Sequence, residues 1–465
     1  TVTFRSDQAG CKDYATVSTV RLYRGGSSAV EIDAFASRLN MTTPTRFVNS
    51  SGQDTFEAIL GRMGARTSLD LMPQKRAARF APLGDGTGDV HDLVMALSDG
   101  VDIRALPFTD RFPVWENLTQ KQTMTTQTFE GSSSRIPFKA TVRFKAPFYP
   151  GHDRASGAPF FYIDVTVRNT GSATASPTFV VARSHKLDFA SSEVVEYSEP
   201  TEAGIANSTT CNYYDETQNP FKAKKATESL AVAAGESSDV DFRGSTPLEF
   251  SDFTGDSIWS YVSPAGYPAT YDDYKRPVYS YYPRGYTGAV WTIDSLAPGE
   301  SRTKRFVLAG YVSDRVLSVS NTAYSDSTFR FRYTGQFADV RKVVNYAITS
   351  RSAGDGIETL SDFFDATVNS DAYLALPSAY RDPVRNLMSY GFQSFLANTW
   401  WARSDSGRDW FSVWEGSSCR YHSTVDVEYN QAWFYLYFWP DLLKQVMTEW
   451  TFYTNASPQG TYISH

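Results

Sequence analysis

Residue types that could do chemistry gather in the stretch from Trp410 to Tyr429. Glu415, Asp426 and His422 lie there among aromatic residues, close to Arg420. Carboxylates in such surroundings often acquire shifted pKa values and act as nucleophile, acid or base. A glutamate beside a helix is more often a cap or an ion-pair partner, so residue types alone leave both interpretations open. A reactive Cys419–His422 pair is conceivable, but an inert thiol is the better interpretation of this cysteine.

The elements around this stretch have a helical pattern. After about residue 337 the apolar period becomes about 3.6 residues, which predicts helices over 340–348, 360–368 and 380–401. A further apolar segment, 427–450, is interrupted by Pro440, which should kink the helix or start a new one. The chemistry-bearing stretch is then expected as a loop between two long helical segments. In the longest predicted helix the apolar stripe comprises Val384, Leu387, Met388, Phe392, Phe395 and Leu396.

The first part of the chain has a β pattern instead. Residues 160–169 alternate with period two, a Thr-Gly-Ser turn follows, and residues 177–182 continue the pattern. This predicts a hairpin, and the turns at 234–236 and 297–300 repeat the arrangement. Many short strands at this spacing predict a large antiparallel β-sandwich. We therefore expect a β-sandwich domain over residues 1–336 and a helical domain over residues 337–465.

The residues from Trp414 to Gln445 resemble a known enzyme family. They read Trp-Glu-Gly, then Tyr-His-Ser-Thr-Val-Asp-Val-Glu-Tyr, then Phe-Trp-Pro-Asp-Leu-Leu-Lys-Gln. This pattern is similar to the catalytic signature of glycoside hydrolase family 116, the bile-acid β-glucosidase or non-lysosomal glucosylceramidase group, and more weakly to family 52 β-xylosidases. The resemblance implies a β-sandwich followed by an (α/α)6 toroid, and a retaining β-glycosidase that acts on a β-glucoside, a β-xyloside or a related glycan.

The resemblance also implies roles for individual residues. Glu415 would be the nucleophile, Asp426 would bind sugar hydroxyls, and His465 would begin a segment that contacts the sugar; we place Ser417 among the substrate-binding residues. Trp401 and Trp414 are candidates for stacking on pyranose rings, although a single tryptophan is more often a core residue than a sugar-stacking one. The family's acid/base aspartate lies far beyond the nucleophile, past His465. We therefore expect a second polypeptide to complete the toroid and supply it.

A non-catalytic protein of the same fold is the alternative. An enzyme needs a second carboxyl near Glu415, whereas a carbohydrate-binding or structural surface protein needs only the sugar-binding residues. No cofactor or metal is expected, because the Gly-rich stretch with Asp85, Asp89 and His91 does not have the spacing of a calcium loop.

Composition limits the partners and the location. Of 465 residues 15% are aromatic, the formal net charge is −7, and no basic run is present, so nucleic acid is excluded as an expected partner. No stretch of the sequence is long and apolar enough for a transmembrane segment. Three cysteines leave the redox compartment open. Five N-glycosylation sequons favour a secreted or cell-surface protein: Asn40, Asn49, Asn117, Asn207 and Asn455.

Overall fold

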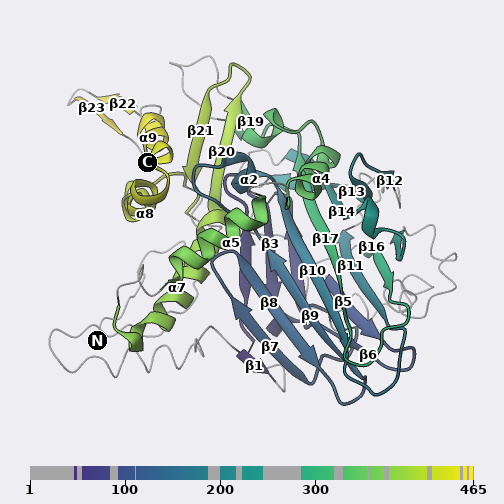
Figure 1. Ribbon diagram of the computed structural model, residues 1–465. Coiled ribbons are helices and arrows are strands. Elements are labelled where there is room, and N and C mark those ends of the chain that lie inside the picture. The colour runs from purple at the N-terminus through teal and green to yellow at the C-terminus, as the bar shows by residue number, and fades with distance from the viewer. Residues whose placement is uncertain are drawn as a thin grey trace.

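The structure is a computed structural model of the chain. It describes residues 47–49, 55–83, 93–109, 111–186, 199–215, 222–244, 284–318, 328–352, 356–370, 376–415, 421–450, 454–457 and 460–463. Figure 1 shows a large β structure with helices α5, α7, α8 and α9 gathered along one side of it.

Two antiparallel sheets face one another and enclose the main core, as the sequence predicts. In spatial order the larger sheet comprises β1 (Phe47–Asn49), β7 (Asn117–Gln122), β8 (Thr126–Ser132), β9 (Phe138–Lys145), β10 (Phe160–Asn169), β17 (Ser301–Val312), β14 (Lys222–Ala233), β13 (Gly204–Asp215) and β12 (Glu199–Pro200). The smaller sheet comprises β15 (Val240–Gly244), β16 (Arg284–Thr292), β11 (Thr178–Lys186), β5 (Leu93–Ser98) and β6 (Ile103–Ala105).

Strand β10 shows why the large sheet is covered on both faces. Its alternating pattern points Phe161 and Ile163 into the core between the sheets. The intervening Phe160 and Tyr162 are buried too, on the outer face, where helix α4 (Val340–Thr349) packs. The Tyr162 hydroxyl donates to the carbonyl of Ala347 at 2.7 Å. A second, smaller core therefore lies between the sheet and this helix.

The predicted hairpins are wrong, because each of the three turns carries the chain from one sheet to the other. Strand β10 belongs to the large sheet and β11 to the small one. In the same way β14 leads to β15, and β16 leads to β17. Turn residues and alternation mark the strand ends correctly, but they do not encode which strands pair. The sandwich is therefore built from strands distant in sequence, such as β10 with β17.

The helices largely follow the predicted pattern. Helices α4 and α5 (Ile357–Val368) confirm two predicted segments, and the Pro440 break is confirmed because α8 (Val425–Phe438) ends before it and α9 (Pro440–Glu449) starts there. In α7 (Ser378–Asn398), Phe392 and Leu396 are buried as expected, but Leu387 is 59% exposed. Short α2 (Asp153–Gly157) and the 3-10 turns η1 (Pro73–Lys75), η2 (Ala234–Glu236) and η4 (Arg332–Gly335) complete the helical elements of the described residues.

The third long helix ends earlier than predicted. Residues expected at its end, Trp400 and Trp401, lie instead in strand β20 (Thr399–Ser404). The Thr399 hydroxyl donates to the Leu396 carbonyl at 2.7 Å and accepts from the Gly64 N–H at 2.6 Å, which closes the helix and starts the strand. A contact with a residue far away in sequence thus ends this helix, and the apolar period could not reveal it.

A four-stranded sheet includes residues from both sides of the expected domain boundary. Its order is β18 (Leu317–Ser318), β19 (Thr328–Phe331), β20 and β21 (Asp409–Val413). Trp410 to Val413 therefore form a strand and not the expected loop. The remaining small sheets comprise β2 (Ala58–Gly61), β3 (Ser68–Met72) and β4 (Ala77–Ala81), and the hairpin β22 (Thr454–Ser457) and β23 (Gly460–Ile463).

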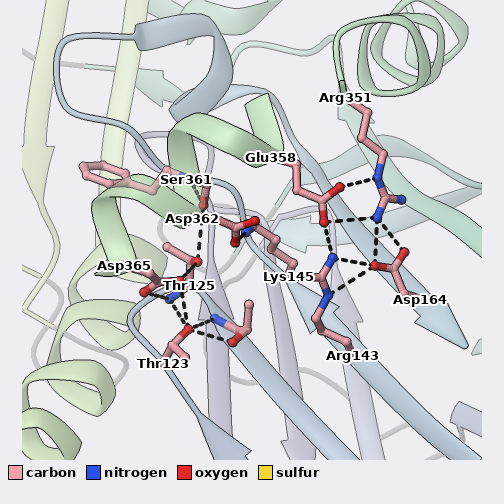
Figure 2. Close-up of polar contacts among 12 residues, drawn as sticks. Thr123, Thr125, Arg143, Lys145, Asp164, Arg351, Glu358, Ser361, Asp362 and Asp365 are labelled. Atoms are coloured by element: carbon pink, nitrogen blue, oxygen red, sulfur yellow. Dashed lines mark hydrogen bonds and ion pairs between the residues drawn. The ribbon is translucent and has the colours of Figure 1, made fainter. Parts of the chain in front are cut away.

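Charged side chains join helix α5 to the large sheet (Figure 2). Arg143 and Arg351 share the carboxylates of Asp164 and Glu358; Arg351 Nη2 lies 2.7 Å from both Asp164 oxygens. Burial opposes ionisation of Glu358, but the hydrogen bonds and charges of the two arginines outweigh it and lower its pKa to about 2. This charge network therefore fixes where α5 lies on the sheet.

A second set of polar contacts fixes the same helix further along. Buried Lys145 pairs with Asp362, and Asp365 accepts hydrogen bonds from the hydroxyls of Thr123 and Thr125. Figure 2 shows these contacts beside the charge network, on the same face of α5.

None of the described helices has the length and apolarity to span a membrane.

Candidate active site

The loop that carries Glu415 begins at the end of strand β21 and returns to the start of helix α8. The Glu415 N–H donates to the carbonyl of Tyr421 at 3.0 Å, and Trp414 forms an antiparallel bridge with His422. The side chain of Glu415 is exposed. The backbone of Trp414 and Glu415 is therefore held against Tyr421 and His422, which positions an exposed carboxylate.

Ser423 closes the base of this loop. Its N–H donates to the Val413 carbonyl at 2.8 Å, and its hydroxyl donates to Glu428 Oε1 at 2.7 Å. The Val413 N–H in turn donates to the same hydroxyl at 3.4 Å. The φ of Ser423 is 50°, in the left-handed region that non-glycine residues rarely adopt, so local strain is accepted where the loop closes.

Two buried carboxyl groups lie beneath the loop. Burial raises the pKa of Glu428, although its hydrogen bond with Ser423 opposes this. Burial raises the pKa of Glu449 well above the ordinary range, against the hydrogen bond from the Phe411 N–H. Both side chains are at most 2% exposed, so they cannot reach a substrate. Glu449 lies outside the stretch that sequence reasoning selected.

Aromatic rings support the loop from behind. The His422 ring stacks on Trp414 with 6.2 Å between centroids and 6° between planes, and the edge of Trp400 meets it at 5.3 Å. His422 Nδ1 lies 3.0 Å from the Ser412 hydroxyl. Burial, together with the charge of Arg66, lowers the pKa of His422 to about 4, so this ring is neutral at pH 7. It supports the loop and has no thiol partner among the described residues, since Cys419 lies outside them.

Arg66 is a site residue that sequence reasoning missed. It lies in the turn between β2 and β3, and its guanidinium carbon is 4.4 Å from the Trp414 ring centroid. Its Nη1 donates to the Ala397 carbonyl at 2.7 Å and to Asn398 Oδ1 at 3.0 Å. No sequence pattern links a residue in an N-terminal turn to the loop of Glu415.

Asp426 lies in the first turn of α8, with an exposed side chain. Because Glu415 is bonded to Tyr421, just before the cap of this helix, the two exposed carboxylates lie at the same end of α8. The structure thus brings the predicted nucleophile and the predicted sugar ligand to one end of one helix.

The two candidate stacking tryptophans are corrected to core residues. Trp414 is 2% exposed and packs behind the loop, whereas Trp401 is 8% exposed and packs in a different core, against Trp439 with 5.6 Å between centroids. Adjacent residues of β20 point to opposite faces of the hairpin, so Trp400 and Trp401 cannot share one sugar platform.

The remaining predicted site residues lie in several places. Ser417, His465, Asn40 and the Asp85–His91 stretch lie outside the described residues, and Asn49 and Asn455 are described only as members of β1 and β22. Asn117 starts β7 and is exposed. Asn207 is corrected as a glycosylation candidate, because it is fully buried and its amide donates to the Gly288 carbonyl at 3.0 Å. No metal-binding group of three or more His, Cys, Asp or Glu is present among the described residues.

A comparison with protein families identifies the β domain. Residues 124–353 match the family model described as the N-terminal domain of beta-glucosidase 2, glycosyl-hydrolase family 116. This part of the chain is similar to a family 116 N-terminal domain. The match runs from just before β8 to just after α4, so it covers most of the large sheet. It confirms the resemblance deduced from the separate Trp414–Gln445 segment, which lies outside the matched range.

The fold of the chain is also similar to that of solved structures. A provisionally named kojibiose phosphorylase from the human microbiome is similar with a TM-score of 0.38 and 9% sequence identity, over 77% of this chain and 42% of that chain. This chain therefore spans less than half the length of that protein. No curated protein matches the sequence.

Proposed function

We propose that this chain carries the nucleophile of a retaining β-glycosidase that acts on a β-glucoside, a β-xyloside or a related glycan. The observation that carries the proposal is Glu415: an exposed carboxylate on a loop fixed at both ends, in a chain with a glycoside hydrolase family domain. The family match supports a glycoside hydrolase type of function, and the retaining mechanism is our inference.

In this mechanism the Glu415 carboxylate attacks the anomeric carbon and the bond to the leaving oxygen breaks. A second carboxyl about 5 Å away gives that oxygen its proton, then deprotonates the water that releases the sugar. Asp426 accepts hydrogen bonds from sugar hydroxyls, with His465 and Ser417 as further sugar-binding residues. In this proposal the acid/base group comes from outside this chain, and the enclosure of Glu428 and Glu449, which are at most 2% exposed, supports this.

A second polypeptide that completes a helical toroid is part of the proposal, as are secretion and glycosylation. The outer face of α8 supports the second polypeptide, since Tyr429, Trp433 and Tyr437 are 69–70% exposed on successive turns. Large apolar groups in a row on one helix are typical of a surface that other protein covers.

The experiment uses a substrate that needs no acid. A 2,4-dinitrophenyl 2-deoxy-2-fluoro-β-glucoside or xyloside loses dinitrophenolate without protonation, so Glu415 alone can form the glycosyl ester. Intact mass and peptide mapping should place one fluoroglycosyl group on Glu415. The Glu415→Gln variant should stay unlabelled, whereas Asp441→Asn, which removes another exposed carboxylate, should label normally. A folded protein labelled at another residue, or not at all, would disprove the nucleophile.

A non-catalytic carbohydrate-binding or structural protein is the second candidate. It is favoured by one observation: the carboxyl groups with raised pKa beneath the loop are closed to substrate. Sugar binding that is abolished by Asp426→Ala, in a protein that the fluoroglycosides never label, would support this candidate instead.

A further inference from the structure

We propose that Arg66, in the β2–β3 turn, is a positioning residue that holds the candidate nucleophile Glu415 in place. The inference rests on the proposed function for its chemical meaning, but its geometry can be tested separately. Three observations support the inference. The β2–β3 turn packs on the β20–β21 hairpin, and Arg66 contacts Trp414, the residue before Glu415. The buried position of Arg66 is also unfavourable unless these contacts compensate for it.

The turn before Arg66 docks along strand β20. Ala65 forms an antiparallel bridge with Trp400, and the Trp401 N–H donates to the Gly64 carbonyl at 2.8 Å. Gly64 has a φ of 70°, and a Cβ added there would lie 2.2 Å from Trp401 Cβ, so only glycine permits this approach. The backbone next to Arg66 is therefore fixed on the β20–β21 hairpin.

The Arg66 side chain then reaches the residue before Glu415 by two routes. One is direct, through the guanidinium stacked on the Trp414 ring at 4.4 Å. The other passes through Asn398, whose side chain accepts from Arg66 at 3.0 Å and whose carbonyl accepts from the Trp414 N–H at 2.8 Å. Ring and backbone of Trp414 are thus both held through Arg66, so the backbone that leads into Glu415 cannot shift at Trp414 without breaking one of these contacts.

The placement of Arg66 is unfavourable unless these contacts compensate for it. The residue is 4% exposed, and a buried charge loses its favourable hydration. Its φ is 52°, in the left-handed region. Stacking on tryptophan and hydrogen bonds to oxygen atoms offset this loss, and the planar guanidinium makes both at once, which an ammonium cannot. Lysine should therefore replace it poorly.

Positioning predicts an effect on rate more than on binding. A nucleophile displaced by about 1 Å can lose on the order of a hundredfold in rate. We expect Arg66→Gly, which also relieves the left-handed φ, to slow the labelling step of Glu415 by at least about tenfold, with little change in the concentration of fluoroglycoside needed for half-saturation. Arg66→Lys should recover only part of the rate, and added methylguanidinium should partly restore Arg66→Gly.

Arg76 supplies the matched control. It lies in the connection between β3 and β4, has a φ of 54°, and donates to the carbonyls of Thr109 and Phe112. Arg76→Gly should leave the labelling rate unchanged at temperatures where both variants are folded. An equal loss in Arg66→Gly and Arg76→Gly, or no loss in either, would overturn the inference.

Hydrogen exchange separates this inference from the proposed function. In Arg66→Gly the amides of residues 413–415 and 423 should exchange at least about tenfold faster than in the parent chain, whereas Arg76→Gly should leave them protected. This readout needs no substrate. If the parent chain is never labelled, the proposed function fails while exchange still tests the role of Arg66. Unchanged exchange in Arg66→Gly would disprove that role, and if that variant does not fold, Arg66→Lys replaces it in both measurements.

Discussion

At the scale of single residues, the site combines one exposed glutamate with two buried ones. Glu415 lies open to solvent, whereas Glu428 and Glu449 are enclosed behind the same loop. Environment, not residue type, separates these three glutamates into one that is open to a substrate and two whose pKa values burial raises. Nothing in the local sequence distinguishes them, because the burial comes from β21 and α9 packing together.

The buried pair should make the stability of the fold depend on pH. In the unfolded chain both carboxyls ionise near pH 4.3, whereas burial raises both pKa values in the folded state, so the folded carboxyls keep their protons to a higher pH. The folded state then binds more protons, so the free energy of unfolding falls as pH rises above 4.3 until the folded pKa values are passed. Glu428→Gln and Glu449→Gln should flatten this decline, measured by thermal unfolding between pH 5 and 8.

The control for this effect is Glu57→Gln, which removes a half-exposed carboxylate in an ion pair with Lys75. It should leave the pH dependence unchanged. A pH profile that is the same in the parent chain and in both buried-glutamate variants would show that these carboxyls ionise in the folded protein as they do in the unfolded one.

Sequence reasoning selected Glu415 and Asp426 as candidates but did not select Arg66 or Glu449. The first two lie in one continuous motif, and a family resemblance gave them roles. The other two are brought to the site by contacts between the β2–β3 turn, strand β21 and helix α9. Trp401 and Trp414 were predicted as sugar platforms because sequence shows the residue type but not which face of a hairpin it occupies.

At the scale of elements, periodicity located strands and helices but not their partners. The apolar periods found α4, α5 and the break at Pro440, because each depends on residues within one segment. The early end of α7 and the crossing of β10 to the other sheet depend on distant contacts, so local pattern could not show them.

The charge network beneath α5 should stabilise the junction between sheet and helix. Glu358→Gln removes a carboxylate shared by Arg143 and Arg351, and leaves two partly buried arginines with Asp164 alone. The expected loss is about 2 kcal/mol at pH 7, between the values for exposed and buried pairs. Urea unfolding measures it.

The pH dependence of this loss has a defined sign. The pKa of Glu358 is lowered to about 2 in the folded state, so its contribution to stability is present above the ordinary glutamate pKa and disappears as pH falls toward 2.

The control variant is Glu130→Gln, which removes an exposed ion pair with Lys139. It should lower the free energy of unfolding by less than about 0.5 kcal/mol. A similar cost for both variants would mean that the network adds nothing beyond a surface ion pair.

At the scale of the whole molecule, the outer face of α8 should govern self-association. Trp433 is 70% exposed in a row with Tyr429 and Tyr437, so copies of the isolated chain can bury this row against each other. Trp433→Lys should lower light scattering and the binding of a hydrophobic dye without changing the unfolding temperature. Val101→Lys, at an isolated site that is 90% exposed, should change neither. Equal scattering by the parent and Trp433→Lys chains would show that this face does not self-associate.

The contact of Arg66 with Asn398 also sets the order of events during synthesis. These two residues are 332 positions apart in the chain. At about 5–20 residues per second, the ribosome needs roughly 20–70 s to make the chain between them. During that time Arg66 cannot make its hydrogen bond with Asn398. The site is therefore completed only after Asn398 has been translated.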